Sequence, residues 1–192
     1  MHNTLASYCR FFLAAIANQG QIGAVLPSQR FLVARMIEPI PPDYPGQILE
    51  LGAGTGVLTE RLAARCPQAR ILACEINAVL AKTTRNRLTA LGFSQRAEVV
   101  CEAAEQLLIQ VARARTRKPD FVLSGIPLGN LDRNSVVNLL ESIHASLAPG
   151  GLYIQFQHSL IDRKKIRDRF SRLRTIPVLM NFPPAFVYFA RK

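Results

Sequence analysis

Three glycines, Gly52, Gly54 and Gly56, stand at alternate positions directly after an apolar run that carries one acid, Glu50. An apolar run that breaks into glycines and continues as a helix-like segment predicts a strand, a tight turn and a helix. Because glycine leaves the backbone bare, a ligand can lie against the amides at the start of that helix. The dinucleotide fingerprint needs a further glycine at position 57, where this chain has Val57. The turn therefore predicts a nucleotide-like ligand that is not a dinucleotide.

A second acid, Glu75, follows the next strand-like run, residues 69–74. An acid at the end of a second parallel strand is well placed to accept hydrogen bonds from both ribose hydroxyls of an adenosine ligand. The alternative is a glycine-tight turn between strand and helix that binds nothing. The two acids, Glu50 and Glu75, and the helix-like segment after the glycines favour the ligand.

Composition favours one well-buried domain, because the chain has 192 residues and 49% of them are hydrophobic. The formal net charge of +11 points to an anionic partner, either nucleic acid or an acidic membrane leaflet, with solubility alone as the plainer reading. No apolar run approaches the roughly 20 residues of a membrane span, and no export signal is expected. The cysteines show no C-x-x-C spacing and the three histidines are scattered, so we expect reduced thiols and no metal site.

The first 45 residues predict two helices. Apolar residues recur at helical spacing over 5–16, which gives the first helix a continuous stripe. That helix either packs on the domain or places its edge at residues 11–13 in a membrane interface. A second helix is expected over 31–38, with Ser28 as its cap, and four prolines between 39 and 45 end it. We therefore assign residues 1–45 to N-terminal helices that cover the substrate or contact the membrane.

Strands and helices alternate from residue 46 onward, which predicts an α/β domain with a mostly parallel sheet over 46–192. Two strand-like runs with no helix between them finish the chain, so we expect seven strands and one antiparallel edge strand. Ligands of such sheets bind at the carboxyl ends of the strands. The expected strands are 47–51, 70–74, 97–101, 120–124, 152–157, 174–179 and 185–190, and the expected helices are 57–65, 78–91, 103–115, 134–147 and 160–171.

Several segments together resemble a known family. The glycine turn with Glu50, the acid Glu75 and the loop after the fourth strand are similar to those of class I S-adenosylmethionine-dependent methyltransferases. Three segments also resemble the bacterial phospholipid N-methyltransferases: I-G-A-V-L-P-S at 22–28, S-G-I-P-L at 124–128 and N-F-P-P-A-F-V-Y at 181–188. The glycine turn is shared by many methyltransferases, whereas these three segments are much more specific, and the match covers nearly the whole chain.

The resemblance implies a Rossmann-like fold and methylation of phosphatidylethanolamine, or of its partly methylated forms, towards phosphatidylcholine. The implied cofactor is S-adenosylmethionine, with Glu75 on the ribose hydroxyls and Ile76 on the adenine. Glu102 and Ala103 would flank the base; the family commonly has an acid where this chain has Ala103, which puts a side-chain contact there in doubt. The implied cofactor-binding set is Ser28, Glu50, Gly52, Gly54, Gly56, Glu75, Ile76, Glu102, Ala103 and Ser124.

The loop after the fourth strand separates two classes of substrate. Enzymes that methylate exocyclic amines of bases usually carry N/D-P-P-Y/F there, with a ring that stacks on the extruded base. The corresponding residues here are Ser124, Ile126, Pro127 and Leu128, without a ring at the end. Such a lining suits an aliphatic amine, so we rank a lipid above RNA. The alternatives are a ribosomal RNA adenine methyltransferase-like enzyme, a methyltransferase for another amino lipid such as an ornithine lipid, and a lipid-surface module without turnover.

Residues in or next to the loops at the carboxyl edge of the sheet are the candidates for groups around the substrate amine. The candidates are Tyr8, Ser124, Ile126, Pro127, Tyr153, His158 and Tyr188, and spacing alone does not choose a proton acceptor among them. Arg30, beside Ser28, is the candidate for the lipid phosphate. Seven cations over 163–174 suit membrane or phosphate binding, with RNA binding and a plain solvated surface as alternatives. We expect a peripheral enzyme on the cytoplasmic face of the cell membrane and leave its oligomeric state open.

Overall fold

One sheet of seven strands organises the molecule, in the order β3-β2-β1-β4-β5-β7-β6. The computed structural model describes residues 27–114, 117–181 and 183–192, with the backbone alone at 27 and 28. Each strand is short and rich in apolar residues, as buried strands of α/β folds are. The strands are β1 (Gln47–Leu51), β2 (Arg70–Cys74), β3 (Ala97–Val100), β4 (Phe121–Ser124), β5 (Leu152–Gln157), β6 (Arg172–Val178) and β7 (Ala185–Arg191).

The pairing confirms the predicted mostly parallel sheet, with antiparallel pairing confined to one edge. Strands β1 to β5 pair in parallel. Strand β7 runs antiparallel to both β5 and β6. The antiparallel strand therefore lies one place in from the edge, and β6 forms the edge itself. The short connection 179–184 explains this order, because it lets β6 and β7 pair as a hairpin while β7 takes the free edge of β5.

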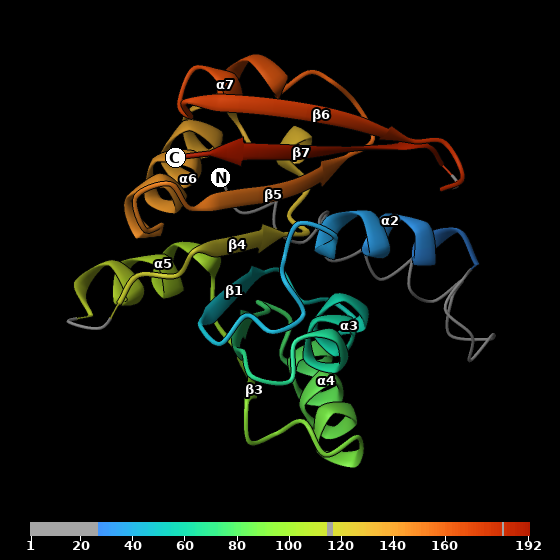
Figure 1. Cartoon of the computed structure of the whole chain (residues 1–192). Helices are drawn as coiled ribbons and strands as arrows, with labels where there is room; N and C mark the ends of the chain where they lie inside the picture. The colour runs from blue at the N-terminus through green and yellow to red at the C-terminus, as the bar shows by residue number, and fades with distance from the viewer. Residues whose placement is uncertain (1–26, 115–116, 182) are drawn as a thin grey trace.

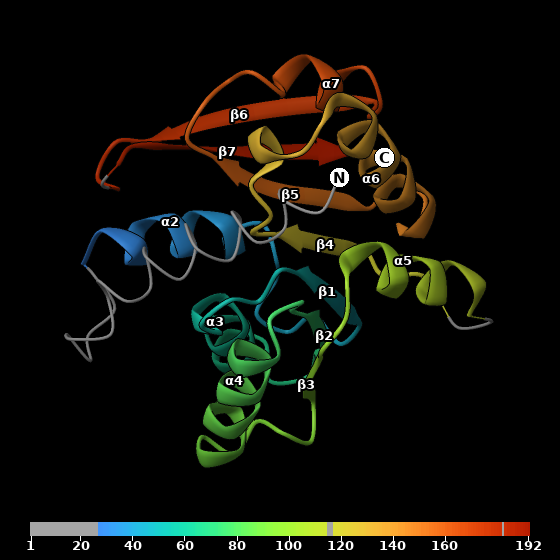
Figure 2. The same cartoon turned by 180° about the vertical axis from the view of Figure 1, so that it is seen from behind.

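Helices cover both faces of the sheet, which gives three layers (Figures 1 and 2). The two layers of helices enclose separate buried clusters, one on each face of the sheet. On one face lie α2 (Pro27–Ile37), α3 (Val57–Arg65) and α4 (Ala78–Ala90). On the other lie α5 (Ala104–Arg113), the short 3-10 helix η1 (Leu128–Asn130), α6 (Arg133–Ser146) and α7 (Arg163–Arg167).

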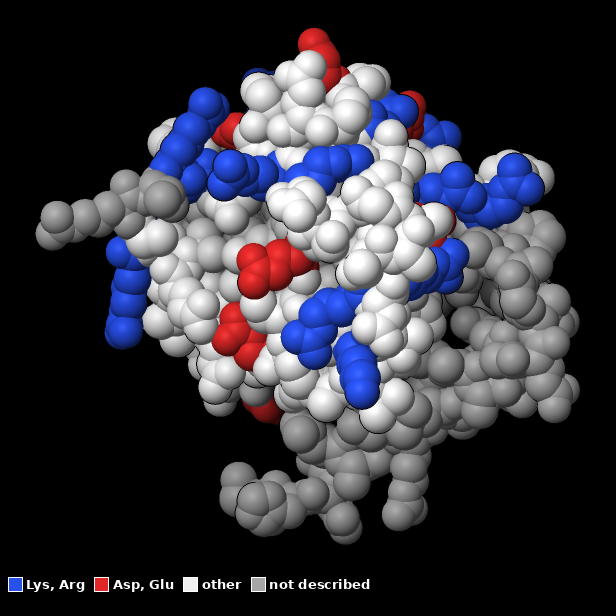
Figure 3. Space-filling view, turned by 90° about the horizontal axis from the view of Figure 1, so that it is seen from below, with Lys and Arg blue, Asp and Glu red and all other residues white. Residues whose placement is uncertain are grey.

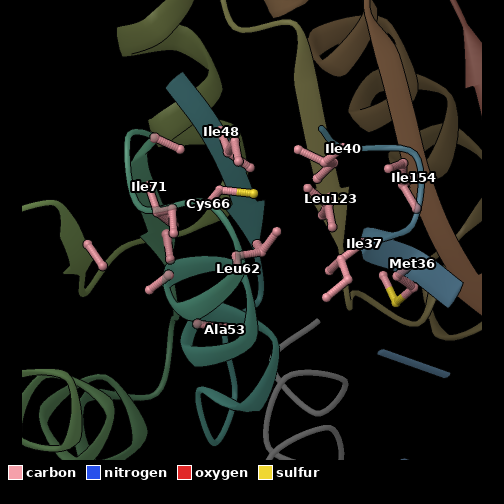
Figure 4. Close-up of a cluster of buried hydrophobic side chains, with 14 of the residues drawn as sticks. Met36, Ile37, Ile40, Ile48, Ala53, Leu62, Cys66, Ile71, Leu123 and Ile154 are labelled. Atoms are coloured by element: carbon pink, nitrogen blue, oxygen red, sulfur yellow. The ribbon is translucent and has the colours of Figure 1, made fainter. Parts of the chain in front are cut away.

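Helix α2 belongs to the first of these clusters. Figure 4 shows Met36 and Ile37 near Leu123 and Ile154 of the sheet, and all four belong to one buried cluster. The helix begins at Pro27, so the prediction that Ser28 caps it is wrong. Proline suits the first helical turn because its fixed φ matches the helix and its missing N–H has no partner there. The predicted first helix lies outside the described residues, and the division at residue 45 stays a prediction.

The helix predicted over 160–171 is much shorter, since α7 spans only Arg163–Arg167. Two apolar residues of this segment are buried, Ile166 and Phe170, and both pack in the second cluster. The buried carboxylate of Asp162 accepts a hydrogen bond from Lys165 at the start of α7. Ile166 is buried from α7 and Phe170 from the turn that follows it, whereas Leu160 and Ile161 in the loop before the helix are exposed.

Candidate active site

The turn after β1 holds its glycines in a conformation that other residues rarely adopt. The φ angles of Gly52, Gly54 and Gly56 are 77°, 55° and 80°. Space is also limiting, because a Cβ on Gly56 would lie 2.4 Å from Cγ2 of Thr84. The hydroxyl of Thr84 donates to the carbonyl of Gly54 at 3.1 Å and so ties α4 to the turn. The glycine spacing in the sequence therefore reflects both backbone conformation and close packing.

Glu75 lies at the end of β2 and is buried against this turn. Its Oε2 accepts a hydrogen bond from the amide of Gly54 at 2.8 Å, and its Oε1 accepts one from the amide of Asn77 at 2.9 Å. The carboxylate thus joins the glycine turn to the start of α4. Each carboxylate oxygen can accept a second hydrogen bond, so the group can also receive ribose hydroxyls.

Glu50 is fully buried below the turn, at the end of β1. Its Oε2 and the neighbouring Oγ1 of Thr59 are both buried without a hydrogen-bond partner among the described residues. The pKa of Glu50 is raised to about 8, chiefly by burial; the Thr59 hydroxyl opposes the shift and the charge of Glu75 adds to it. An orphaned buried carboxyl oxygen is costly unless a ligand supplies the missing donor. A ligand with a cationic amino group fits this position.

The loop after β4 packs on the glycine turn, backbone against backbone. A Cβ on Gly125 would lie 3.0 Å from the carbonyl oxygen of Gly52. A Cβ on Gly52 would lie 3.2 Å from Cγ1 of Ile126, so the Ile126 side chain borders the turn. Ile126 and Pro127 are half-buried, whereas Leu128 is fully buried in the core. The structure therefore places Ile126 beside the turn, with Pro127 following it in the same loop.

Two glutamines of β5 hold this loop from below, and sequence reasoning missed both. The side-chain amides of Gln155 and Gln157 donate to the carbonyl of Ile126 at 2.9 and 3.1 Å. Tyr153 donates its hydroxyl to Oε1 of Gln155. Both glutamines are buried. The signal in the sequence was two polar residues at alternate positions of an otherwise apolar strand. Buried strands rarely contain polar side chains that have no hydrogen-bond partner.

Phe156 and His158 extend the site along β5. Cε1 of Phe156 lies 3.8 Å from the position of a Cβ on Gly125, and the Phe156 and His158 rings have centroids 5.9 Å apart. Nδ1 of His158 lies 3.0 Å from the carbonyl oxygen of Pro184. A ring nitrogen facing a carbonyl carries the proton, which leaves Nε2 with a free lone pair. His158 is exposed, so that lone pair lies at the surface near the loop.

Three of the groups predicted around the amine are fully buried. Ser124 is fully buried, and its Oγ accepts from the amide of Ile126 at 3.2 Å. Tyr188 is fully buried and donates its hydroxyl to the carbonyl of Ser159 at 2.9 Å. Tyr153 is fully buried as well, and burial raises its pKa well above the usual range. In the structure these side chains are held in hydrogen bonds that support the loops, and their roles around the amine stay predictions.

Other predicted residues lie on the rim or outside the described part of the chain. Tyr8 and the side chain of Ser28 are not among the described groups. Arg30 is exposed on α2. Ile76, in the loop after β2, is 56% exposed, and Glu102 and Ala103, in the loop after the neighbouring strand β3, are half-buried. Glu102 accepts a hydrogen bond from Gln110 at 2.9 Å. An exposed apolar side chain beside Glu75, the acid predicted to bind the ribose, suits a flat base.

The three-layer fold, the glycine turn after β1 and the buried acids at the ends of β1 and β2 define a class I S-adenosylmethionine-dependent methyltransferase. The family model described as a methyltransferase domain matches residues 48–151, and the chain belongs to this family. S-adenosylmethionine is its cofactor. Glu75 fits the cofactor's ribose, the glycine turn fits the part that lies against bare backbone, and Glu50 fits the amino group.

Comparisons with named proteins agree with this class. The chain is 29% identical over 174 residues to an ornithine lipid N-methyltransferase of Singulisphaera acidiphila, covering 88% of each chain. The magnesium protoporphyrin IX methyltransferase of Synechocystis, solved with bound S-adenosylmethionine, superimposes with a TM-score of 0.69 at 15% identity, over 100% of this chain and 98% of that one. A precorrin-6y C5,15-methyltransferase of Geobacter metallireducens has the same TM-score, over 89% and 93% of the two chains, at 15% identity.

Two further findings concern the described residues only. Among them, no helix has both the length and the apolar character that a membrane crossing needs. In the same ranges, no group of three or more His, Cys, Asp or Glu side chains is placed to hold a metal ion. Cys66 and Cys74 are buried free thiols, and Cys101 is an exposed one.

Proposed function

We propose that this enzyme N-methylates an amino lipid, namely phosphatidylethanolamine or its partly methylated forms, towards phosphatidylcholine. The observation that carries the proposal is the loop after β4. Where methyltransferases of bases present a stacking ring, this chain has Leu128, whose side chain is fully buried in the core. The accessible part of this loop is the half-buried Ile126 and Pro127, and a side chain on Gly125 would crowd the carbonyl oxygen of Gly52. Such a surface suits a small aliphatic amine.

The ornithine lipid N-methyltransferase relative favours a second candidate within the same class. Its match extends over 88% of both chains, so it includes the substrate-side loops as well as the glycine turn. Both candidate substrates present an aliphatic amine on a lipid. The relative supports the methylation of an amino lipid and leaves the choice of head group to experiment.

Exposed apolar side chains support contact with a membrane surface. Leu179 and Met180, in the turn between β6 and β7, are 76% and 66% exposed. Leu160 and Ile161, in the loop after β5, are 48% and 75% exposed. Both segments follow the carboxyl ends of strands, as the loop after β4 does. Large apolar side chains that are this exposed mark interaction surfaces.

Cations next to these apolar residues favour an anionic bilayer. Arg163, Lys164 and Arg167 of α7 are exposed and directly follow Leu160 and Ile161. Near an anionic leaflet each such cation contributes about 1 kcal/mol. The net charge of +11 alone does not identify the binding face, because in the view of Figure 3 basic side chains lie at several separate places with acidic ones between them.

The chemistry requires a neutral amine that is aligned and shielded from water. When bound, S-adenosylmethionine supplies an electrophilic methyl group on a sulfonium. Ile126 and Pro127 would exclude water from the amine, and Nε2 of His158 would accept the proton that the amine loses. Arg30, exposed on α2, would bind the lipid phosphate. Positioning and desolvation would supply most of the rate enhancement.

Radiolabelled methyl transfer tests this function. The full chain is incubated with labelled S-adenosylmethionine and vesicles of phosphatidylglycerol that contain phosphatidylethanolamine, monomethylated phosphatidylethanolamine or an ornithine lipid. A parallel reaction contains ribosomal RNA. We expect label in the lipid fraction of at least one vesicle type and none in the RNA. Label in RNA alone would overturn the proposal, and intact cofactor binding without any transfer would indicate a lipid-surface module.

A further inference from the structure

A second concave site lies on the sheet, away from the glycine turn. It is a groove of about 620 Å³ on the α2 side of β5, β7 and β6. Its walls are Arg172, Arg174 and Ile176 of β6, Phe189 and Arg191 of β7, and the end of α2. Leu152, at the amino end of β5, is part of its floor, whereas the loop after β4 lies at the opposite ends of the strands. In Figure 1 no helix crosses in front of this part of β7 and β6.

Three arginines lie close together in this groove. Arg172 of β6 is directly opposite Arg191 of β7 in the antiparallel register, and Arg174 follows two residues along on the same face. Like charges directly opposite each other on neighbouring strands destabilise a sheet. Arg191 donates to the carbonyl of Gly150 at 2.8 Å, which fixes its guanidinium without neutralising it.

No carboxylate compensates these charges in the described part of the chain. None of the ion pairs found there includes Arg172, Arg174 or Arg191. Glu38 at the wall of the groove is already paired with Arg35. The grouping of three cations therefore leaves room for an external anion.

The floor between the arginines is apolar. Leu152, Ile176 and Phe189 contribute it, and Leu152 and Phe189 are almost fully buried. Arginine stems commonly cover such surfaces while their charged ends stay in water. Covering the apolar floor explains one arginine on each strand, but it does not require two arginines directly opposite each other on neighbouring strands. A ligand with an anionic head and an apolar chain satisfies both the charges and the floor.

We propose that this groove binds a single-chain anionic lipid, with its acyl chain on the apolar floor and its anionic head among Arg172, Arg174 and Arg191. The volume falls within the range of about 300–1,000 Å³ that small-molecule sites occupy. Guanidinium groups bind phosphate and carboxylate oxygens in a bidentate manner, which suits this head group. The site is separate from the methyl-transfer site and goes beyond the proposed function.

Titration calorimetry with the full chain tests the groove. The probe is lysophosphatidylglycerol below its micelle concentration, and inorganic phosphate is the second probe. We expect the wild type to bind the lipid with a Kd in the micromolar range and phosphate at least about tenfold more weakly, because phosphate lacks the chain. The double variant Arg172→Gln/Arg174→Gln should lose at least about tenfold in lipid affinity.

A matched variant separates the site from general charge. Arg85→Gln/Arg133→Gln removes the same charge from exposed positions on α4 and α6 and should bind the lipid like the wild type. Removal of Arg172 and Arg174 relieves repulsion, so that variant should unfold at no lower temperature and bind S-adenosylmethionine unchanged.

Three results would overturn the proposal: no lipid binding by the wild type, equal binding by Arg172→Gln/Arg174→Gln, or phosphate binding as tight as lipid binding. None of these measurements uses methyl transfer, so a failure here leaves the proposed function untouched. Failure of methyl transfer to vesicles would equally leave this site standing.

Discussion

Gly56 and Gly92 both have positive φ angles, 80° and 75°, but their surroundings differ. A Cβ on Gly56 would lie 2.4 Å from Cγ2 of Thr84, whereas nothing lies within 4 Å of a Cβ on Gly92. Alanine substitutions at these two glycines therefore separate the cost of backbone strain from the cost of steric overlap. The glycine motif after β1 combines both constraints in one short turn.

We expect Gly92→Ala to lower the free energy of unfolding by about 1–2 kcal/mol, the cost of left-handed backbone for alanine. Gly56→Ala should cost about 1–3 kcal/mol more, because the methyl group overlaps Thr84. Urea unfolding measures both values. In a Thr84→Ser background, which removes Cγ2, the extra cost of Gly56→Ala should fall. Equal costs for the two single variants would show that overlap is unimportant.

Glu50 makes stability depend on pH. Burial raises its pKa to about 8 in the folded chain, compared with 4.5 for an unperturbed glutamate. Between these values the folded chain holds a proton that the unfolded chain has lost, so stability falls as pH rises through this window. Below pH 4.5 both states are protonated and the effect is absent.

We expect Glu50→Gln to flatten this slope. The variant should gain a few kcal/mol relative to the wild type by about pH 8, and the difference should disappear near pH 4.5. Urea unfolding at a series of pH values measures it, and Glu98→Gln on β3, where the side chain is exposed, is the control. If the difference in free energy of unfolding between Glu50→Gln and the wild type were the same at all pH values, Glu50 would not be the source of the pH dependence.

His158 is the described group best placed to take a proton from a substrate amine. With Nδ1 bonded to Pro184, its Nε2 is free to accept. We expect His158→Ala to lower turnover by about 10²-fold or more, typical of a lost general base, with an unchanged Kd for S-adenosylmethionine. His144→Ala, on α6 with its ring against Phe170, is the control. If the His158→Ala variant turned over as fast as the wild type between pH 6 and 9, His158 would not be the general base.

The sequence predicted Glu75, Glu50 and Ile126 at the site because their types and positions follow strand ends. It did not show that Ser124 and Tyr188 are buried, because both faces of the sheet are covered. Alternation along a strand then does not show which side chain points toward a ligand. The glutamines of β5 and the ring of Phe156 were missed because their contacts come from distant segments.

At the level of elements, β5 supports the loop after β4 through one carbonyl. Ile126 receives two side-chain amides, from Gln155 and Gln157. Two donors on one acceptor restrict the loop more than a single bond does, because both hydrogen bonds must break before the loop can shift away from β5. The loop is therefore supported by a neighbouring strand rather than by its own turn.

Removal of one donor tests this support. We expect Gln157→Leu to lower the free energy of unfolding by about 1 kcal/mol, since Gln155 still satisfies the carbonyl. Turnover should fall by about tenfold while the Kd for S-adenosylmethionine stays within about twofold, because the loss affects alignment. Gln106→Leu, exposed on α5, is the control. A parallel loss of cofactor affinity would indicate a general structural role.

The order of elements was largely predictable because strand and helix patterns alternate clearly from residue 46 onward. The short α7 was not, because a run of cations at 163–169 does not show that Ile166 and Phe170 alone need burial. The sequence also grouped Arg172 and Arg174 with these cations. In the structure they lie on the other side of β6, since Leu173 packs with α7's cluster while Ile176 packs with that of α2.

At the scale of the whole molecule, membrane binding should combine apolar contact and charge. We expect Leu179→Ser/Met180→Ser to weaken binding to phosphatidylglycerol vesicles by about tenfold or more, because exposed side chains would no longer enter the lipid. Binding of the wild type should also fall with added salt, which screens the cations. Vesicle flotation measures both effects.

The control for this prediction is Leu91→Ser/Ile109→Ser, which removes two other apolar side chains of 46% and 47% exposure, on the loop after α4 and on α5. This variant should float like the wild type. Equal flotation of the Leu179→Ser/Met180→Ser variant and the wild type would place the membrane contact elsewhere.

The insertion of β7 between β5 and β6 has a consequence for synthesis on the ribosome. A nascent chain that has emerged only as far as Val178 contains β6 without β7, its one partner strand in the described part of the chain, and β5 with an open outer edge. The parallel half of the sheet can assemble during translation, but this edge closes only after Arg191 has left the exit tunnel. Until then two unpaired strand edges are exposed to other chains, so a chaperone that shields them would act at this late stage.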